Sequence, residues 1–269
     1  MPDLVGVFRE PEFSPGRVRD DAAILERTAD ALAARGLAVR LGGPDLLAGT
    51  APGAVLAMCQ APAALAALDR HAGRVPVVNA PTAIRACYRA ETARLLAAAG
   101  LPVPRTRLVA STGTAPVDAA PCWVKRGDVH AMTAADVVLA PDAAALAAAL
   151  ADFRTRGIEQ AVLQEHVPGT VVKFYGVGGR FFRCYTDGAA PPALIPALAA
   201  AARAGAACLG LEVFGGDLVV PPDGAPALVD VNDWPSFARC RDEAAEAIAD
   251  HLCERLAAAA PARRAADAR

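Results

Sequence analysis

The sequence predicts a mixed α/β and α+β protein, in which a doubly wound parallel sheet is followed by a part rich in antiparallel strands. Up to residue 79, short apolar segments alternate with segments of helical periodicity, the βαβ rhythm of a parallel sheet. After residue 104, strand-like segments cluster and are interrupted first by a helix at 142–156, which favours an α+β arrangement. A chain of 269 residues is long enough for one to two domains.

In the first part, each element follows from local spacing. Apolar residues at helical spacing predict a helix over 21–35, which Gly36 ends. Residues 81–100 are also expected to be helical and to end at Gly100, since prolines stand at 102 and 104. The boundary between the two parts therefore lies between 79 and 104. The remaining elements expected here are strands at 4–8, 37–41, 54–58 and 75–78 and a helix at 62–71.

The second part is expected to hold most of the strands. Residues 261–269 form a tail that is expected to be disordered. The predicted strands are 105–109, 121–126, 137–140, 161–166, 170–177, 180–185, 211–220 and 226–231, and the predicted helices are 142–156, 192–208 and 236–258.

The composition excludes several classes of protein. The 27 basic and 29 acidic residues nearly balance, and no basic run suggests a nucleic-acid partner. No uninterrupted apolar run reaches the roughly 18 residues of a membrane span. The seven cysteines show no CxxC spacing and share no ligand spacing with the four histidines, so neither a disulfide framework nor a zinc site is expected. A cytoplasmic protein is therefore expected.

Lysine is unusually rare in this chain. Only Lys125 and Lys173 are lysine, which leaves 25 of the 27 basic residues as arginine. Both lysines stand in apolar, strand-like segments, where a charge is costly unless it meets an anion. A compact ammonium on a flexible stem suits a phosphate, whereas arginine offers a planar fork. The alternative is that either lysine snorkels from an edge strand into solvent.

A second group of polar residues lies near the carboxyl-terminal end. The expected strands around Asp217 and Asp230 are joined by a Pro-Pro-Asp-Gly turn, and Asp230 and Asn232 share one face by the two-residue period. A hairpin brings the three side chains together as oxygen ligands suited to Mg²⁺. The same residues also fit a strand that ends in an Asx turn, with Asp217 as ordinary turn chemistry.

In chain order, these segments resemble the ATP-grasp superfamily over about residues 79–255. Lys125 matches a nucleotide-binding lysine, and Arg89 stands where the family usually has another. The hinge that grips adenine is matched by Gln164, Glu165, His166 and Val167, and the metal-binding set by Asp217, Asp230 and Asn232. The resemblance implies a two-lobed ATP-grasp domain at 80–260, with a lid lobe at 105–167 and a carboxyl-terminal lobe at 168–260. Residues 1–79 then form an α/β domain on the substrate side.

Within the superfamily, three details resemble the inositol 1,3,4-trisphosphate 5/6-kinase branch, with ribosomal-protein S6 glutamate ligase-like enzymes next. His130-Ala-Met132 resembles its His-x-Met motif, and Lys173-Phe-Tyr-Gly-Val-Gly178 its lysine-bearing strand. Asp230-Val-Asn-Asp-Trp-Pro-Ser236 resembles its Asp-x-Asn ending, although Ser236 and Phe237 depart from the usual Gly-Tyr.

The resemblance implies an enzyme that uses ATP and two Mg²⁺ ions to transfer the γ-phosphoryl group to a small, polar or anionic acceptor. Lys173 and His130 are the implied catalytic residues. Ser14, Gly16 and Arg17 in the first loop are candidates for holding an anionic group of the substrate, or the loop is simply polar. Arg183, the third catalytic candidate, and Arg180 lie on the strand after Lys173 and could hold the same anion or face solvent. The alternatives are a carboxylate–amine ligase that works through an acyl phosphate, and a nucleotide-binding module without catalysis.

Overall fold

The computed structural model describes residues 3–49, 51–113, 119–187, 192–222 and 224–267. Its first sheet has the order β2-β1-β3-β4, and every pair in it is parallel. This confirms the doubly wound sheet predicted from the alternation of apolar and helical segments. Its strands are β1 (Leu4–Val7), β2 (Val39–Gly42), β3 (Ala54–Ala57) and β4 (Val77–Val78), and its helices are α1 (Val18–Ala34) and α2 (Pro62–Asp69).

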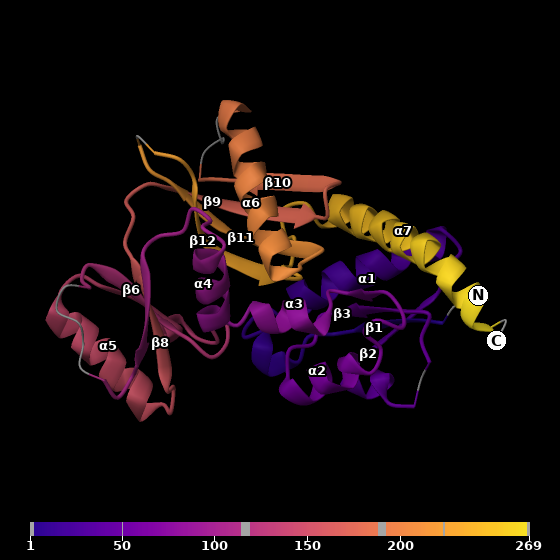
Figure 1. Cartoon of the computed structure of the whole chain (residues 1–269), viewed down its shortest axis with the longest axis horizontal. Coiled ribbons are helices and arrows are strands. Elements are labelled where there is room, and N and C mark those ends of the chain that lie inside the picture. Colours follow the sequence, from indigo (N-terminus) through magenta and orange to yellow (C-terminus); the bar gives the residue numbers. More distant parts are fainter. Residues whose placement is uncertain (1–2, 50, 114–118, 188–191, 223, 268–269) are drawn as a thin grey trace.

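A second sheet, antiparallel and in the order β5-β8-β6-β7, comes from the middle of the chain. Helix α5 (Ala143–Thr155) covers one face of it with Leu146, Leu150 and Phe153. Figure 1 shows this sheet and its helix at one end of the molecule. The strands are β5 (Thr106–Ala110), β6 (Cys122–Arg126), β7 (Val137–Ala140) and β8 (Gln160–Glu165).

The third sheet, also antiparallel, has the order β10-β9-β11-β12. Helix α6 (Ile195–Leu209) packs on one face, where Phe174 and Phe214 are buried. The other face carries Tyr175 and Val177 into a core shared with α1 and α7 (Arg241–Asp267), and Figure 1 shows those two helices side by side. The strands are β9 (Thr170–Val177), β10 (Phe181–Tyr185), β11 (Val213–Val220) and β12 (Ala227–Asp233).

Two expectations about helices are corrected. The predicted helix 81–100 is two helices, α3 (Pro81–Ala86) and α4 (Arg89–Ala98), because the backbone is extended at Tyr88. Helix α7 begins at Arg241 rather than at 236 and continues to Asp267. The disorder expected for residues 261–269 stays a prediction.

The first and third sheets are joined by side-chain contacts to the backbone. Asn79, which follows β4, accepts hydrogen bonds from the backbone N–H groups of Glu212 (2.8 Å) and Val213 (2.9 Å). Its amide nitrogen donates to the carbonyl oxygen of Val213 at 2.7 Å. The buried indole of Trp234 donates to the carbonyl oxygen of Val78 at 3.0 Å. These bonds link β4, at the edge of the first sheet, to the start of β11 and the end of β12 in the third sheet.

One helical stretch of the described chain, Pro192–Leu209, has the length and mean hydropathy (1.5) of a membrane span. Its residues Leu198, Ala202 and Leu209 lie in the core beneath the third sheet. About 33% of the stretch is buried inside the fold.

Candidate functional site

A cavity of about 670 Å³ lies where the N-terminal loop, the start of α4, the loop after β6 and the third sheet meet. The residues that line it include five of the predicted site residues, brought from distant parts of the chain. These are Arg89, His130, Lys173, Asp230 and Asn232.

The centre of the site is a row of side chains across the third sheet. Lys173 on β9 stands directly opposite Asp217 on β11, and Asp217 stands directly opposite Asp230 on β12. Residues opposite one another in neighbouring strands project from the same face, so the three charges lie side by side. The ammonium of Lys173 donates to the carboxylate of Asp217 at 2.8 Å. Strand register therefore brings a predicted catalytic lysine together with two predicted metal ligands.

Arg89 reaches this row from the first turn of α4. The helix starts here because the backbone N–H of Ala90 bonds to the carbonyl oxygen of Gly127 at 2.9 Å, which satisfies a donor that a helix start leaves free. The Arg89 guanidinium is 9% exposed and lies 3.7 Å from Asp230. One of its terminal nitrogens, Nη1, is buried and has no hydrogen-bond partner among the described residues. A buried, unpaired guanidinium nitrogen at a cavity is suited to an anion.

The charges in the row shift the protonation equilibrium of Asp230. Burial favours the neutral acid, but the positive charges of Arg89 and Lys125 outweigh it, and the pKa of Asp230 falls below its ordinary value. Asp230 is therefore ionised at neutral pH. Asn232 supports this state by donating its amide to the Asp230 carboxylate at 3.2 Å.

Lys125 is buried beside this row and donates to the side-chain oxygen of Gln164 at 2.7 Å. Gln164 in turn donates to the carbonyl oxygen of Val229, which ties β8 to β12. Burial is the main influence on Lys125, and it lowers the pKa to about 8, with the charge of Asp230 opposing the shift. An incoming anion would stabilise the charged form of Lys125, because its ammonium donates only to the neutral amide of Gln164 among the described residues.

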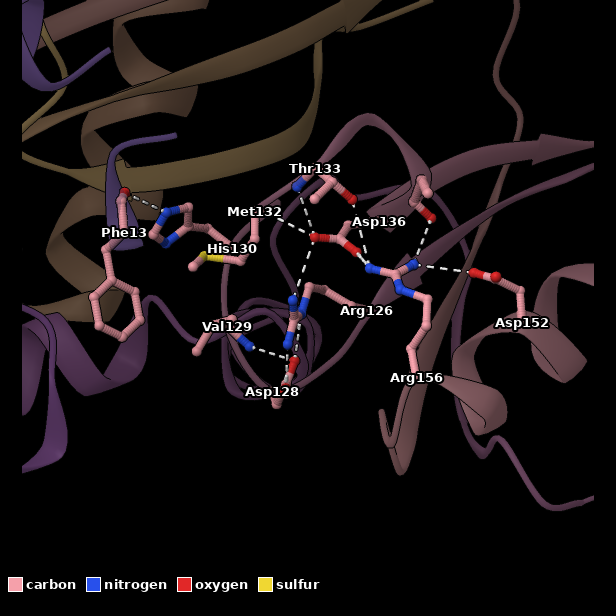
Figure 2. Close-up of polar contacts among 11 residues, drawn as sticks. Phe13, Arg126, Asp128, Val129, His130, Met132, Thr133, Asp136, Asp152 and Arg156 are labelled. Atoms are coloured by element: carbon pink, nitrogen blue, oxygen red, sulfur yellow. Dashed lines mark hydrogen bonds and ion pairs between the residues drawn. The ribbon is translucent and has the colours of Figure 1, made fainter. Parts of the chain in front are cut away.

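His130 lies in the loop after β6 and faces the N-terminal loop. Its Nε2 is 2.9 Å from the carbonyl oxygen of Phe13 (Figure 2), a contact that joins the loop after β6 to the N-terminal loop. Burial chiefly lowers the pKa of His130, and the positive charge of Arg9 adds to the effect. The imidazole is therefore neutral at neutral pH and donates from Nε2.

The loop that carries His130 is fixed by the buried carboxylate of Asp136 (Figure 2). It accepts the backbone N–H groups of Met132 (2.7 Å) and Thr133 (2.9 Å). It also pairs with Arg126 at 3.3 Å and, more closely, with Arg156 at the end of α5. Burial alone raises the pKa of Asp136, but the hydrogen bonds from Arg156 and the backbone outweigh this effect and lower the pKa to about 2. The loop is thereby tied to the sheet and to α5.

The wall opposite His130 contains residues that the sequence did not assign. Arg9 contacts Asp21 at 3.2 Å and Asp233 at 3.7 Å, and Gln60 donates to Asp233 at 2.9 Å. Gln60 and Arg9 follow β3 and β1, at the carboxyl ends where open α/β sheets bind ligands. The sequence could have indicated Arg9 and Gln60 through the same rule that singled out Ser14 and Arg17, both of which line the cavity.

Other predicted residues do not line the cavity. Arg183 is exposed and pairs with Glu243 on α7, and Arg180 pairs with Glu254. Glu165 and His166 line a separate cavity of about 360 Å³ near β5, where Glu165 pairs with Arg105 at 3.1 Å. Gly16 and Val167 lie close to these regions in the chain but are absent from both linings.

The oxygen ligands of the row fit magnesium by their chemistry. Asp217 and Asp230 are adjacent, and the side-chain oxygen of Asn232 is not engaged by a described residue. Mg²⁺ is usually held by one or two carboxylates together with phosphate oxygens and water. The described residues contain no group of three His, Cys, Asp or Glu side chains that could hold a metal ion.

No family model and no curated protein matches the chain. Solved structures do match it. A RimK domain protein ATP-grasp from Sphaerobacter thermophilus is 24% identical, with a TM-score of 0.68 over 92% of this chain and 98% of that one. The D-alanine–D-alanine ligase of Bacillus anthracis complexed with ATP is 12% identical, with a TM-score of 0.73 over 95% and 97%.

A third structure is that of the ATP-grasp ligase PsnB complexed with a minimal precursor, 17% identical with a TM-score of 0.64 over 94% of this chain and 99% of that one. All three similarities extend over nearly the full length of both chains. The chain therefore has the ATP-grasp fold.

Proposed function

We propose that the chain is an ATP-dependent carboxylate–amine ligase that works through an acyl phosphate. The observation that carries the proposal is the row of Lys173, Asp217 and Asp230 beside the buried Arg89 in an ATP-grasp fold. Lys173, Asp230 and Arg89 line the cavity. The names of the similar structures support this chemistry, since two of the three are named as ligases.

ATP is proposed to lie between the second and third sheets. Lys125 and the unpaired Nη1 of Arg89 would hold its α- and β-phosphates, because both side chains are buried cations without a full set of partners. Gln164 and Glu165 end β8, and His166 and Val167 begin the segment that leads from the second sheet to β9 of the third. These four residues would contact adenine. The lid, residues 105–167, would close over the nucleotide and exclude water.

Asp217, Asp230 and Asn232 would hold Mg²⁺. The metal would neutralise the phosphate oxygens during transfer. Lys173 lies in the same row and would stabilise the negative charge on the transferred group. His130, neutral and fixed against the N-terminal loop, would orient the acceptor.

In the proposed reaction, a carboxylate oxygen of the acceptor attacks the γ-phosphorus, and the bond from that phosphorus to ADP breaks. An amine then attacks the carbonyl carbon of the acyl phosphate, and inorganic phosphate leaves. The chain's residues bring the reactants together and balance charge, which supplies most of the catalysis in phosphoryl transfer.

Small-molecule kinase activity is the second candidate. The motifs around His130 and Lys173 resemble the inositol phosphate kinases and favour it, whereas the similar structures favour the ligase. In either case we propose a small acceptor with an anionic group, no nucleic-acid or membrane partner, and a cytoplasmic location.

The decisive experiment measures ADP, inorganic phosphate and product together. With a panel of carboxylic acids and hydroxylamine as the amine, a ligase forms ADP, phosphate and a hydroxamate, and all three depend on the acid. A kinase forms ADP and a stable phosphorylated product without hydroxylamine, a result that would overturn the ligase proposal. Absence of ATP binding by calorimetry, with or without Mg²⁺, would overturn both.

A further inference from the structure

The charged groups around the cavity are unequal in number. Five cationic side chains and three carboxylates line it among the described residues. Each carboxylate already has a partner, since Arg9 serves both Asp21 and Asp233, and Arg89 faces Asp230. Lys173 is paired with Asp217.

The remaining two cations are Arg17 and Arg239. Both are exposed in the cavity wall, and neither has a carboxylate partner among the described residues. Their segments touch, because Arg241 donates to the carboxylate of Asp20 at 3.2 Å. Both guanidinium groups therefore belong to the part of the lining where the start of α1 meets the segment before α7. Two like charges in one part of a cavity favour an anion between them.

The sheet fixes where this end lies relative to the reacting centre. The guanidinium of Arg239 lies over the ring of Tyr185, 5.2 Å from its centroid. Tyr185 on β10 stands directly opposite Lys173 on β9, so it continues the row of Lys173, Asp217 and Asp230 by one strand. Neighbouring strands are about 4.8 Å apart. Arg239 is therefore displaced along the row from Lys173, on the side away from Asp230.

We propose that Arg17 and Arg239 form a subsite for a second anionic group of the acceptor, about one to two strand spacings (roughly 5–10 Å) from the group that receives the phosphoryl. This inference rests on the proposed function for the position of the reacting group. The substrate class is a small dianion whose second charge is a carboxylate or a phosphate. Stacking on Tyr185 holds the planar guanidinium in place while leaving its N–H groups free for such a group.

Calorimetry with Mg²⁺ and a non-hydrolysable ATP analogue tests the subsite. The probes are glutarate and adipate against valerate and hexanoate, which match them in length but carry one charge. O-phosphoserine against serine reports whether a phosphate is preferred as the second charge. Wild-type protein is expected to bind the dianions about tenfold tighter or more, the effect of one charge-assisted contact.

Arg17→Gln and Arg239→Gln are each expected to remove most of this preference, with unchanged affinity for the analogue. Arg203→Gln is the matched control, because Arg203 also stacks on an aromatic ring, that of Phe182, and lies outside the cavity lining. Equal affinity for dianions and monoanions, binding of neither, or a preference that survives both substitutions would overturn the subsite. Failure of the analogue to bind would instead count against the proposed function, and the comparison of acids is then made without nucleotide.

Discussion

Nε2 of His130 lies 2.9 Å from the carbonyl oxygen of Phe13, a residue 117 positions earlier in the chain. This contact closes the cavity between the second sheet and the N-terminal loop. Because the His130 loop is tied to its own sheet through Asp136, the contact joins two parts of the molecule rather than two flexible loops.

His130→Ala is expected to raise the KM for the acceptor about tenfold, the effect of losing one buried hydrogen bond, while the KM for ATP changes less than about threefold. The reason is that His130 contacts the N-terminal loop, on the proposed acceptor side of the cavity, and not Lys125. Steady-state kinetics with each substrate varied in turn measures both constants. An equal rise in both would place His130 at the nucleotide instead.

Asp136→Asn is expected to destabilise the fold by about 3 kcal/mol, since it leaves two arginines beside a neutral buried amide. Urea unfolding measures the change. Asp152→Asn is the matched control, because Asp152 pairs with the same Arg156 but is half exposed, and it is expected to change stability by less than about 1 kcal/mol.

The same carboxylate predicts a dependence of stability on pH. The folded pKa of Asp136, about 2, is lower than the unfolded value, so its contribution is present above about pH 4 and is lost as the pH falls towards 2. Acid unfolding of the wild type is expected to show this loss, and Asp136→Asn is expected to flatten the curve in that range. A variant with the wild-type pH profile would show that Asp136 does not contribute.

The depressed pKa of Lys125 predicts a second pH effect, on catalysis. Its charged form prevails below about pH 8, so kcat/KM for ATP is expected to fall about tenfold per unit of pH above that value. Lys125→Arg keeps its charge throughout and is expected to remove the decline, although its larger head group lowers the activity overall. A decline of the same midpoint in this variant would assign the titration to another group.

Asp230→Asn is expected to lower turnover below about one part in a thousand while the circular dichroism spectrum stays unchanged, because charge compensation during transfer is lost. Near-normal turnover would remove Asp230 from the proposed metal site.

Lys173→Arg tests the other end of the row. The substitution is expected to lower kcat about tenfold or more with little change in the KM for ATP, because a guanidinium does not fit the same compact position. Lys173 is half exposed, so the fold tolerates the change. Unchanged kcat would make the pair with Asp217 structural.

The sequence predicted the parallel sheet and most strands because their apolar runs are short and separated by clear turn residues. It did not predict the break between α3 and α4, because the donor that starts α4 is satisfied by Gly127, a residue far along the chain. Local periodicity carries no information about such a partner.

The same distinction applies to the site. Lys173, Asp217 and Asp230 were identified from motifs, and strand register placed them in one row. Arg183 was expected to hold the substrate anion because it lies on the strand after Lys173, but it pairs with Glu243 on α7 and does not line the cavity. Asp233 was overlooked because its partners, Arg9 and Gln60, come from the first sheet, and only the tertiary fold brings them together.

The bonds that Asn79 makes to Glu212 and Val213 have a mechanical consequence. They hold the first and third sheets together as one rigid unit. Among the described residues, the second sheet is connected to this unit mainly by the hydrogen bonds of Gln164, Ala90 and His130. We therefore expect the molecule to open by movement of the second sheet relative to the other two. The wall formed by Arg9, Asp233 and Gln60 would stay in place, whereas His130 would leave the cavity, so the acceptor site would be complete only in the closed form.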